Sequence, residues 1–188
     1  MKKITERYKN TFTDKSFVVS IFVAILLFAV SLPINFFASA YATSSASWPV
    51  GDIILDNIPV FKLDLVYAYG PILFWLVIAI ACFRDPKTLP FTLKAIALFV
   101  VVRSIFVTLT HLGVSPADVP VDAQSNFIKR LSYGGDLFFS GHTGLPFLMS
   151  LVFKENKYLR IFCVISAIFF GAVVLMVHMH YSIDVLAD

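Results

Sequence analysis

Residues 17–41 read FVVSIFVAILLFAVSLPINFFASAY and contain no charged side chain over 25 positions. A helix needs about 20 mostly apolar residues to cross the hydrocarbon core of a bilayer. The run is too long for the apolar core of a signal peptide, and no cleavage context follows it before Trp48. We therefore expect residues 17–41 to form a retained membrane span.

The composition of the whole chain supports the same class of protein. Of its 188 residues, 59% are hydrophobic and 14% are charged, whereas soluble domains average about 45–50% apolar and about 25% charged residues. We predict an all-α polytopic membrane helix bundle with five complete spans and the start of a sixth. The chain 1–188 is expected to be a single transmembrane domain whose sixth span is cut short after residue 188. The four further complete spans are expected at residues 64–84, 91–112, 137–153 and 161–178.

The charge distribution predicts how these spans are oriented. Basic residues gather in the N-terminal segment 1–16 and in the connections 84–87 and 154–160, whereas the alternate connections are acidic. Basic loops stay on the cytoplasmic side of a membrane, so we expect a cytoplasmic N-terminus. The opposite, periplasmic or lumenal side is then expected to carry the reactive residues His111, Asp136, His142, His180 and Asp184.

Several classes of function are excluded by charge and cysteine content. A net charge of +3 with scattered Lys and Arg gives no basic patch for nucleic acid. The two cysteines, Cys82 and Cys163, lie in apolar runs and are expected to be buried, which excludes a disulfide scaffold and a four-cysteine metal site. The sequence carries no signal for an oligomeric state.

The C-terminal segment His180-Tyr181-Ser182-Ile183-Asp184 carries the first candidate catalytic pair. His180 and Asp184 lie four positions apart, so they share one face if the segment is helical. A carboxylate that holds one imidazole nitrogen leaves the other nitrogen free to act as a nucleophile. We therefore predict His180 as the nucleophile and Asp184 as the residue that orients it.

A second segment, Gly135 to Thr143, places a histidine beside a Ser-Gly pair at the start of a predicted span. Helix N-termini bind phosphate through unpaired N–H groups and the helix dipole, and Gly141 allows a close approach next to Ser140. His142 can cycle its proton near neutral pH, so it is a candidate general acid.

Alternative interpretations apply to single residues. A lone histidine at a membrane edge is more often an interfacial polar residue, and we interpret His111 and His178 in this way. For His142 and His180 together, the paired aspartate and the shared face favour catalysis. Arg103 lies midway along a predicted span, where it is expected either to bind a lipid phosphate or to pair internally, for example with Asp136.

These motifs resemble those of the sphingomyelin synthases and their relatives, a branch of the type 2 phosphatidic acid phosphatase superfamily. Residues 134–143 are similar to the family motif Cys-Gly-Asp-x-x-Phe-Ser-Gly-His-Thr, with Gly134 in place of Cys. Residues 180–185 are similar to His-Tyr-Thr-x-Asp-Val. Two looser similarities, at Asp52 and over residues 103–115, extend the resemblance over most of the chain from Asp52 onward.

The resemblance implies a six-span enzyme with a metal-independent ping-pong reaction and no cofactor. It implies that His180 attacks a phospholipid phosphorus, that Asp184 orients it, and that His142 protonates the departing diacylglycerol. Both substrates, the phospholipid donor and the lipid alcohol acceptor, would come from the membrane. We expect the residues that contribute to substrate binding to be Arg103, Asp136, Ser140 and Gly141.

The departures from the wider superfamily bear on the choice of reaction. The chain has no Lys-x6-Arg-Pro element, and Val173-Val174 stand where the superfamily carries Ser-Arg. This argues against an ordinary lipid phosphate phosphatase. We expect transfer of a phospho-headgroup to a lipid alcohol such as ceramide or diacylglycerol through a phosphohistidine. The alternatives are a lipid phosphate phosphatase or phospholipase C-like hydrolase, and a catalytically silent lipid-binding membrane protein.

Overall fold

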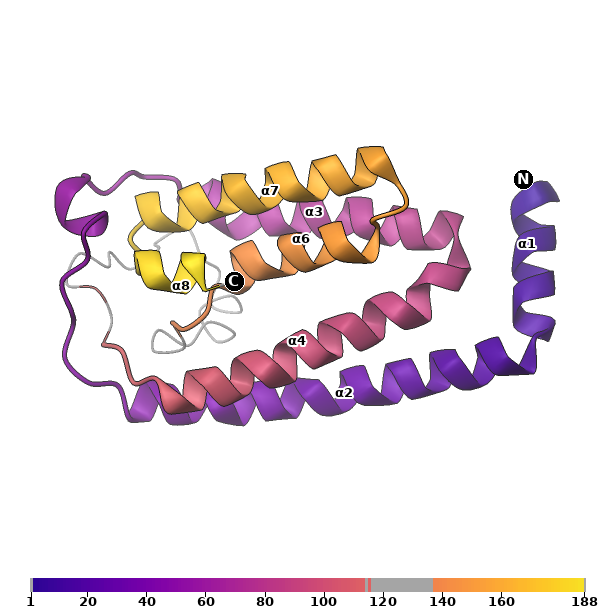
Figure 1. The fold of residues 1–188 in the computed structure, drawn as a ribbon, viewed down its shortest axis with the longest axis horizontal. Helices are drawn as coiled ribbons and strands as arrows, with labels where there is room; N and C mark the ends of the chain where they lie inside the picture. Colours follow the sequence, from indigo (N-terminus) through magenta and orange to yellow (C-terminus); the bar gives the residue numbers. More distant parts are fainter. Residues whose placement is uncertain (1, 114, 116–136, 188) are drawn as a thin grey trace.

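The structure is a computed structural model that describes residues 2–113, 115 and 137–187. Every regular element in this part of the chain is helical, as predicted (Figure 1). In chain order the elements are α1 (Lys2–Thr13), α2 (Lys15–Ser44), the 3₁₀ turn η1 (Leu55–Asn57), α3 (Asp64–Arg84), the 3₁₀ turn η2 (Pro86–Thr88), α4 (Leu89–Leu109), α6 (Gly141–Val152), α7 (Lys157–Met176) and α8 (Ser182–Leu186).

Four stretches of helix in the described residues are long and apolar enough to cross a membrane. They are Lys15–Ser44, Asp64–Arg84, Pro86–Leu109 and Lys157–Met176. Each overlaps a span that was predicted from the sequence. The chain therefore has the helices of an integral membrane protein, although the predicted count of five spans plus the start of a sixth is not confirmed.

The difference in count comes from the C-terminal part of the chain. The span expected at residues 137–153 is a helix, α6, of only 12 residues, and such a helix is about 18 Å long against a hydrocarbon core of about 30 Å. Residues 137–140 stay outside the helix, and their backbone groups bond to other segments instead. Where the sixth span was expected to start, the described residues contain the five-residue helix α8.

The helices form two groups that share one core. Figure 1 shows α2 paired with α4, and α3, α6 and α7 together on the other side. A cluster of buried apolar side chains joins α3, α4, α6 and α7. Its members are Phe74, Ile78, Cys82, Ile96, Met149, Phe153, Cys163 and Phe170.

The two ends of the bundle differ in chemistry, as the charge pattern predicted. α8 and the N-terminus of α6 lie at one end, and α1 lies at the other end, where it runs across the direction of α2 (Figure 1). The end with α8 holds His180 and His142, whereas the end with α1 holds the basic connections 84–87 and 154–160. His142 and His180 thus lie at one end and the basic connections at the other, as predicted. The side of the membrane that each end faces stays a prediction.

The C-terminus of α7 has an unusual residue at its left-handed position. His178 has a φ of 56°, and the N–H groups of His178 and Met179 donate to the carbonyls of Leu175 and Val174 at 3.0 and 3.1 Å. This is the Schellman arrangement, in which glycine is the usual residue. His178 was expected to be an interfacial polar residue, but its side chain is buried in the protein.

Replacing His178 with glycine and with valine is expected to have different effects on the free energy of unfolding. The left-handed backbone conformation of His178 is unfavourable for residues other than glycine. His178→Gly should therefore leave the free energy of unfolding unchanged or raise it. His178→Val puts a β-branched residue there and should lower that free energy by about 1–3 kcal/mol. Thermal unfolding of both variants in one detergent measures the difference, and equal midpoints would contradict this account of the helix end.

Candidate active site

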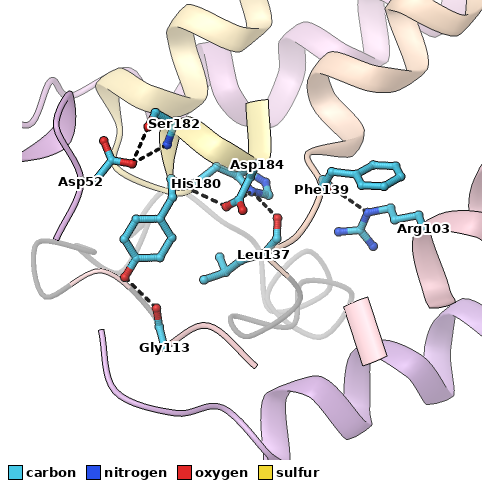
Figure 2. Close-up of polar contacts among 9 residues, drawn as sticks. Asp52, Arg103, Gly113, Leu137, Phe139, His180, Ser182 and Asp184 are labelled. Atoms are coloured by element: carbon cyan, nitrogen blue, oxygen red, sulfur yellow. Dashed lines mark hydrogen bonds and ion pairs between the residues drawn. The ribbon is translucent and has the colours of Figure 1, made fainter. Parts of the chain in front are cut away.

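The two sequence motifs meet at one end of the bundle. The N–H of Ser140 donates to the carbonyl of Asp184 at 3.2 Å, and Nδ1 of His180 lies 2.9 Å from the carbonyl oxygen of Leu137. Figure 2 shows Leu137 beside His180 and Asp184, with Phe139 and Arg103 on the neighbouring side. Segments more than 40 positions apart in the sequence are therefore held together by direct hydrogen bonds.

The hydrogen bonds of His180 define which of its ring nitrogens is free. A carbonyl oxygen only accepts, so Nδ1 must carry the proton that it shares with Leu137. The same Nδ1 lies 3.4 Å from Oδ2 of Asp184. The neutral ring therefore has its lone pair on Nε2. The sequence predicted that Asp184 holds the ring, but the Leu137 carbonyl is the closer partner.

Asp184 is fully buried at the start of α8. Its Oδ2 accepts a hydrogen bond from the backbone N–H of Tyr181 at 2.9 Å, which fixes the carboxylate beside the imidazole. Its Oδ1 has no hydrogen-bond partner in the described part of the chain. A buried carboxylate in this position stabilises positive charge on the His180 ring.

Asp52 anchors the same turn from a distant part of the chain. Its Oδ2 accepts from the backbone N–H of Ser182 at 2.6 Å and from the Ser182 hydroxyl at 2.7 Å, while its Oδ1 accepts from the N–H groups of Ile54 and Leu55 at 2.9 and 3.0 Å. Burial opposes ionisation of Asp52, but the hydrogen bonds from Leu55 and Ser182 outweigh it and hold the pKa of the carboxyl below its ordinary 3.8. The sequence does not indicate this role, because no local pattern links Asp52 to Ser182, 130 positions away.

Asp52→Asn is expected to loosen the turn that carries His180. The change removes the charge from the Asp52–Ser182 bonds, and hydrogen bonds to a charged group contribute about 1.5–3 kcal/mol. Because the folded pKa is lowered, the contribution is complete above pH 3.8 and is lost as the pH falls below that value. Unfolding measured against pH should show a smaller acid-dependent loss in the variant. The same acid dependence in both proteins would contradict the role given to Asp52.

Tyr181 ties the turn to two other loops. Its hydroxyl donates to the carbonyl of Gly113 at 2.8 Å and accepts from the N–H of Val50 at 3.3 Å. Burial raises the pKa of the Tyr181 phenol, so the group remains a neutral donor. With Asp52, this contact holds the His180 segment against the loops that follow α2 and α4.

His142 is the second residue of α6, and Tyr67 of α3 fixes its ring. The two rings stack with centroids 4.5 Å apart and planes at 16°, and His142 also has a hydrogen bond with the backbone of Tyr67. His142 interacts electrostatically with both His180 and Arg103. The two predicted catalytic histidines are thus close enough to interact electrostatically. Tyr67 is a further site residue, which no sequence signal identified.

A small cavity adjoins His142. It has a volume of about 250 Å³ and is lined by Gly141, His142 and apolar residues of α3, α6 and α7. His180 is not among its lining residues, so only one of the two imidazoles faces this space. A Cβ placed on Gly141 would have a single neighbour within 4 Å, Leu145 at 3.9 Å. The open surface at Gly141 is consistent with the predicted close approach of a ligand.

The N-terminus of α6 has the features of an anion site. The carbonyl of Ser140 accepts from the N–H groups of Thr143 and Gly144 at 3.2 and 2.9 Å. The N–H groups of Gly141 and His142 have no acceptor within the described residues. The buried Oγ of Ser140 and Oγ1 of Thr143 also have no partner there. Unpaired donors at a helix N-terminus are suited to phosphate oxygens.

Arg103 reaches the site from α4 and has partners within the protein. Its Nε donates to the carbonyl of Phe139 at 2.8 Å, and its Nη1 donates to Oδ1 of Asn35 in α2 at 3.3 Å. Arg103 therefore positions the segment before α6. The expected partner Asp136, also predicted to bind substrate, lies outside the described residues. Within those residues, no group of three or more His, Cys, Asp or Glu side chains comes close enough to hold a metal ion.

One comparison with known proteins bears on this site. The family model described as PAP2 superfamily C-terminal matches residues 134–187, a segment that contains both histidine motifs. No curated protein and no solved structure matches the chain. The family match supports a relationship between the site-bearing C-terminal segment and the PAP2 superfamily, as the sequence motifs suggested.

Proposed function

We propose that this protein transfers a phospho-headgroup from a glycerophospholipid to a lipid alcohol such as ceramide or diacylglycerol. One observation carries the proposal: the Leu137 carbonyl fixes the proton of His180 on Nδ1, which leaves the Nε2 lone pair as a nucleophile. The match to the PAP2 superfamily supports the broader class of lipid phosphate phosphatases and phosphotransferases. The similarity of residues 134–143 and 180–185 to the sphingomyelin synthases supports transfer within that class.

In the first half-reaction, Nε2 of His180 attacks the phosphorus of the donor lipid. The N–P bond forms as the bond between phosphorus and the diacylglycerol oxygen breaks. Protonated His142 gives its proton to that oxygen, so diacylglycerol leaves as a neutral alcohol. The buried Asp184 carboxylate stabilises the positive charge that the His180 ring gains.

In the second half-reaction, the acceptor lipid takes the headgroup from His180. Neutral His142 accepts the proton of the acceptor hydroxyl, whose oxygen attacks the phosphorus. The N–P bond then breaks, and its electron pair returns to Nε2. Both catalytic residues thus end in their starting states, as a ping-pong cycle requires.

The remaining predicted site residues are proposed to bind the phosphate. The N–H groups at the start of α6, beside Ser140 and Gly141, are placed to receive its oxygens. Arg103 adds positive charge while it holds the Phe139 carbonyl, and Asp136 is proposed to contribute from the preceding segment. We further propose that this end of the bundle faces the periplasm or lumen, following the distribution of basic residues.

Headgroup-labelled phospholipids test the proposal directly. Purified protein is incubated with labelled donor alone, with ceramide, or with diacylglycerol, and the products are separated by chromatography. Label in a new lipid only when an acceptor is present supports transfer. Water-soluble label that forms equally with and without acceptor indicates a hydrolase instead. No product at all, together with unchanged lipid binding in His180→Ala, would identify a silent lipid-binding protein.

Asp184→Asn is expected to lower kcat by about 10²-fold, in the range for loss of one electrostatic group at a reacting centre. The Leu137 carbonyl still holds Nδ1–H in the variant, so the ring keeps its tautomer and only the charge is lost. The Michaelis constant should change little, because Asp184 is buried behind His180. Steady-state kinetics separates the two parameters, and an unchanged kcat would contradict the role of the carboxylate.

A further inference from the structure

A polar cavity lies at the end of the bundle opposite His180, where α1 meets the first turns of α2 and α4. It has a volume of about 580 Å³, and Arg7, Lys87 and Lys94 line it together with one carboxylate, Asp14. Asp14 is the N-cap of α2 and accepts from the N–H of Ser16 at 2.9 Å. Three cations against one engaged carboxylate give the cavity a positive balance.

Two of these cations are held in place by the surrounding helices. Nζ of Lys94 donates to Oγ of Ser20 at 2.9 Å, and Nη1 of Arg7 donates to the carbonyl of Arg84 at 2.8 Å. Lys94 lies within a helix apolar enough to cross the membrane, where a charged side chain is costly unless it serves a specific contact. An anion in the cavity would provide such a contact.

A buried hydroxyl in the same cavity indicates a ligand independently of these charges. Thr11 is only 3% exposed, and its Oγ1 has no hydrogen-bond partner in the described residues. The first turns of α2 and α4 also line the cavity, through Phe17 and Phe91. The positive ends of two helix dipoles therefore add to the attraction for an anion.

An apolar cavity adjoins the polar one and shares Phe17 with it. It has a volume of about 480 Å³, and side chains such as Phe28, Trp75, Ile78 and Ile96 line it. A free phosphate ion would leave this space unfilled. A phospholipid carries an anionic phosphate and an apolar chain in one molecule, so it matches both cavities at once.

We propose that this end of the protein binds an anionic phospholipid, with its phosphate in the cavity of Arg7, Lys87 and Lys94 and an acyl chain in the cavity beside Trp75. The phosphate cavity lies at the end of the bundle opposite the His180 site (Figure 1), whereas Trp75 of the apolar cavity also lines the small cavity beside His142. It does not depend on the proposed transfer reaction. Clusters of Lys and Arg next to membrane spans bind anionic lipids in this manner.

Fluorescence quenching of Trp75 tests this proposal in the full-length chain. The chain has two tryptophans, and Trp48→Phe leaves Trp75 as the only one. The protein is placed in phosphatidylcholine nanodiscs that contain a minor fraction of phosphatidylglycerol or phosphatidylcholine with brominated acyl chains. We expect stronger quenching by the brominated phosphatidylglycerol. Equal quenching by the two lipids would overturn the proposal.

Two double variants, both made in the Trp48→Phe background, distinguish a specific binding site from non-specific electrostatic attraction. Lys87→Gln with Lys94→Gln removes two cavity cations, while Lys154→Gln with Lys157→Gln removes equal charge at the same end but outside the cavity. Each lysine is expected to contribute about fivefold to the affinity for the anionic lipid. The first pair of substitutions should therefore raise the phosphatidylglycerol fraction that gives half-maximal quenching by about 25-fold. The second pair should leave it nearly unchanged, and equal shifts would overturn the proposal.

Two further arms complete the experiment. Single Lys87→Gln alters an exposed residue and should still shift the midpoint about fivefold if the double variant fails to fold. Excess inorganic phosphate should not reduce quenching by brominated phosphatidylglycerol. If phosphate removes the preference over phosphatidylcholine, the cavity is a site for the free ion and the lipid proposal is wrong.

Discussion

His180→Ala should lower the rate of headgroup release and transfer by about 10⁴-fold or more, the scale seen when an enzyme loses its nucleophile. The physical reason is that Nε2 of His180 forms the only covalent bond between protein and phosphorus in the proposed cycle. Nearby groups cannot replace it, because the Leu137 carbonyl and the turn anchored by Asp52 orient the His180 ring specifically.

The measurement compares turnover of a labelled phospholipid by wild type and variant in the same detergent. His111→Ala is the matched control, because it removes a histidine at the same end of the bundle whose ring packs against Tyr41 of α2. The control should keep its activity. Full activity in His180→Ala would contradict the assigned nucleophile, and equal loss in both variants would point to a folding defect.

His142→Ala should lower the rate by about 10²–10⁴-fold with a natural phospholipid, the range for loss of a general acid. The size of the loss should depend on the leaving group. Diacylglycerol oxygen needs a proton as it departs, whereas a nitrophenolate does not. With a nitrophenyl ester of the phospho-headgroup, the first step in the variant should therefore be nearly normal.

Pre-steady-state kinetics shows this difference directly. In His142→Ala the nitrophenyl donor should give a burst of nitrophenol, about one per active site, followed by slow turnover. The slow phase reflects the second half-reaction, in which His142 also serves as the base. His180→Ala should give no burst. A burst-free His142 variant, or equal losses with both donors, would remove the acid–base role from His142.

Much of the fold follows from the sequence alone. Long apolar runs such as residues 17–41 require helices in a bilayer, and four helical stretches in the described residues are long and apolar enough to cross one. The short α6 was not predicted, because hydropathy does not distinguish the non-helical residues 137–140 from the helix that follows. Tertiary hydrogen bonds of residues 137–140 to Arg103, His180 and Asp184 stabilise that boundary.

The candidate site was predictable only in part, because some of its contacts join residues that are far apart in the sequence. Residue type and spacing indicated His142, His180 and Asp184. The carbonyl of Leu137, the carboxylate of Asp52 and the ring of Tyr67 act through contacts across long separations in the sequence. A backbone carbonyl has no residue-specific signal, so its control of the His180 tautomer becomes visible only in three dimensions.

Trapping the covalent intermediate on His180 is the decisive test of the proposed reaction. Wild-type protein is mixed with phosphate-labelled donor lipid in the absence of acceptor, quenched in alkali, and digested for mass spectrometry. The account predicts an acid-labile, alkali-stable phospho-headgroup on His180 that disappears when ceramide or diacylglycerol is added before the quench. Label on another residue, or turnover with no protein-bound label at any time, would contradict it.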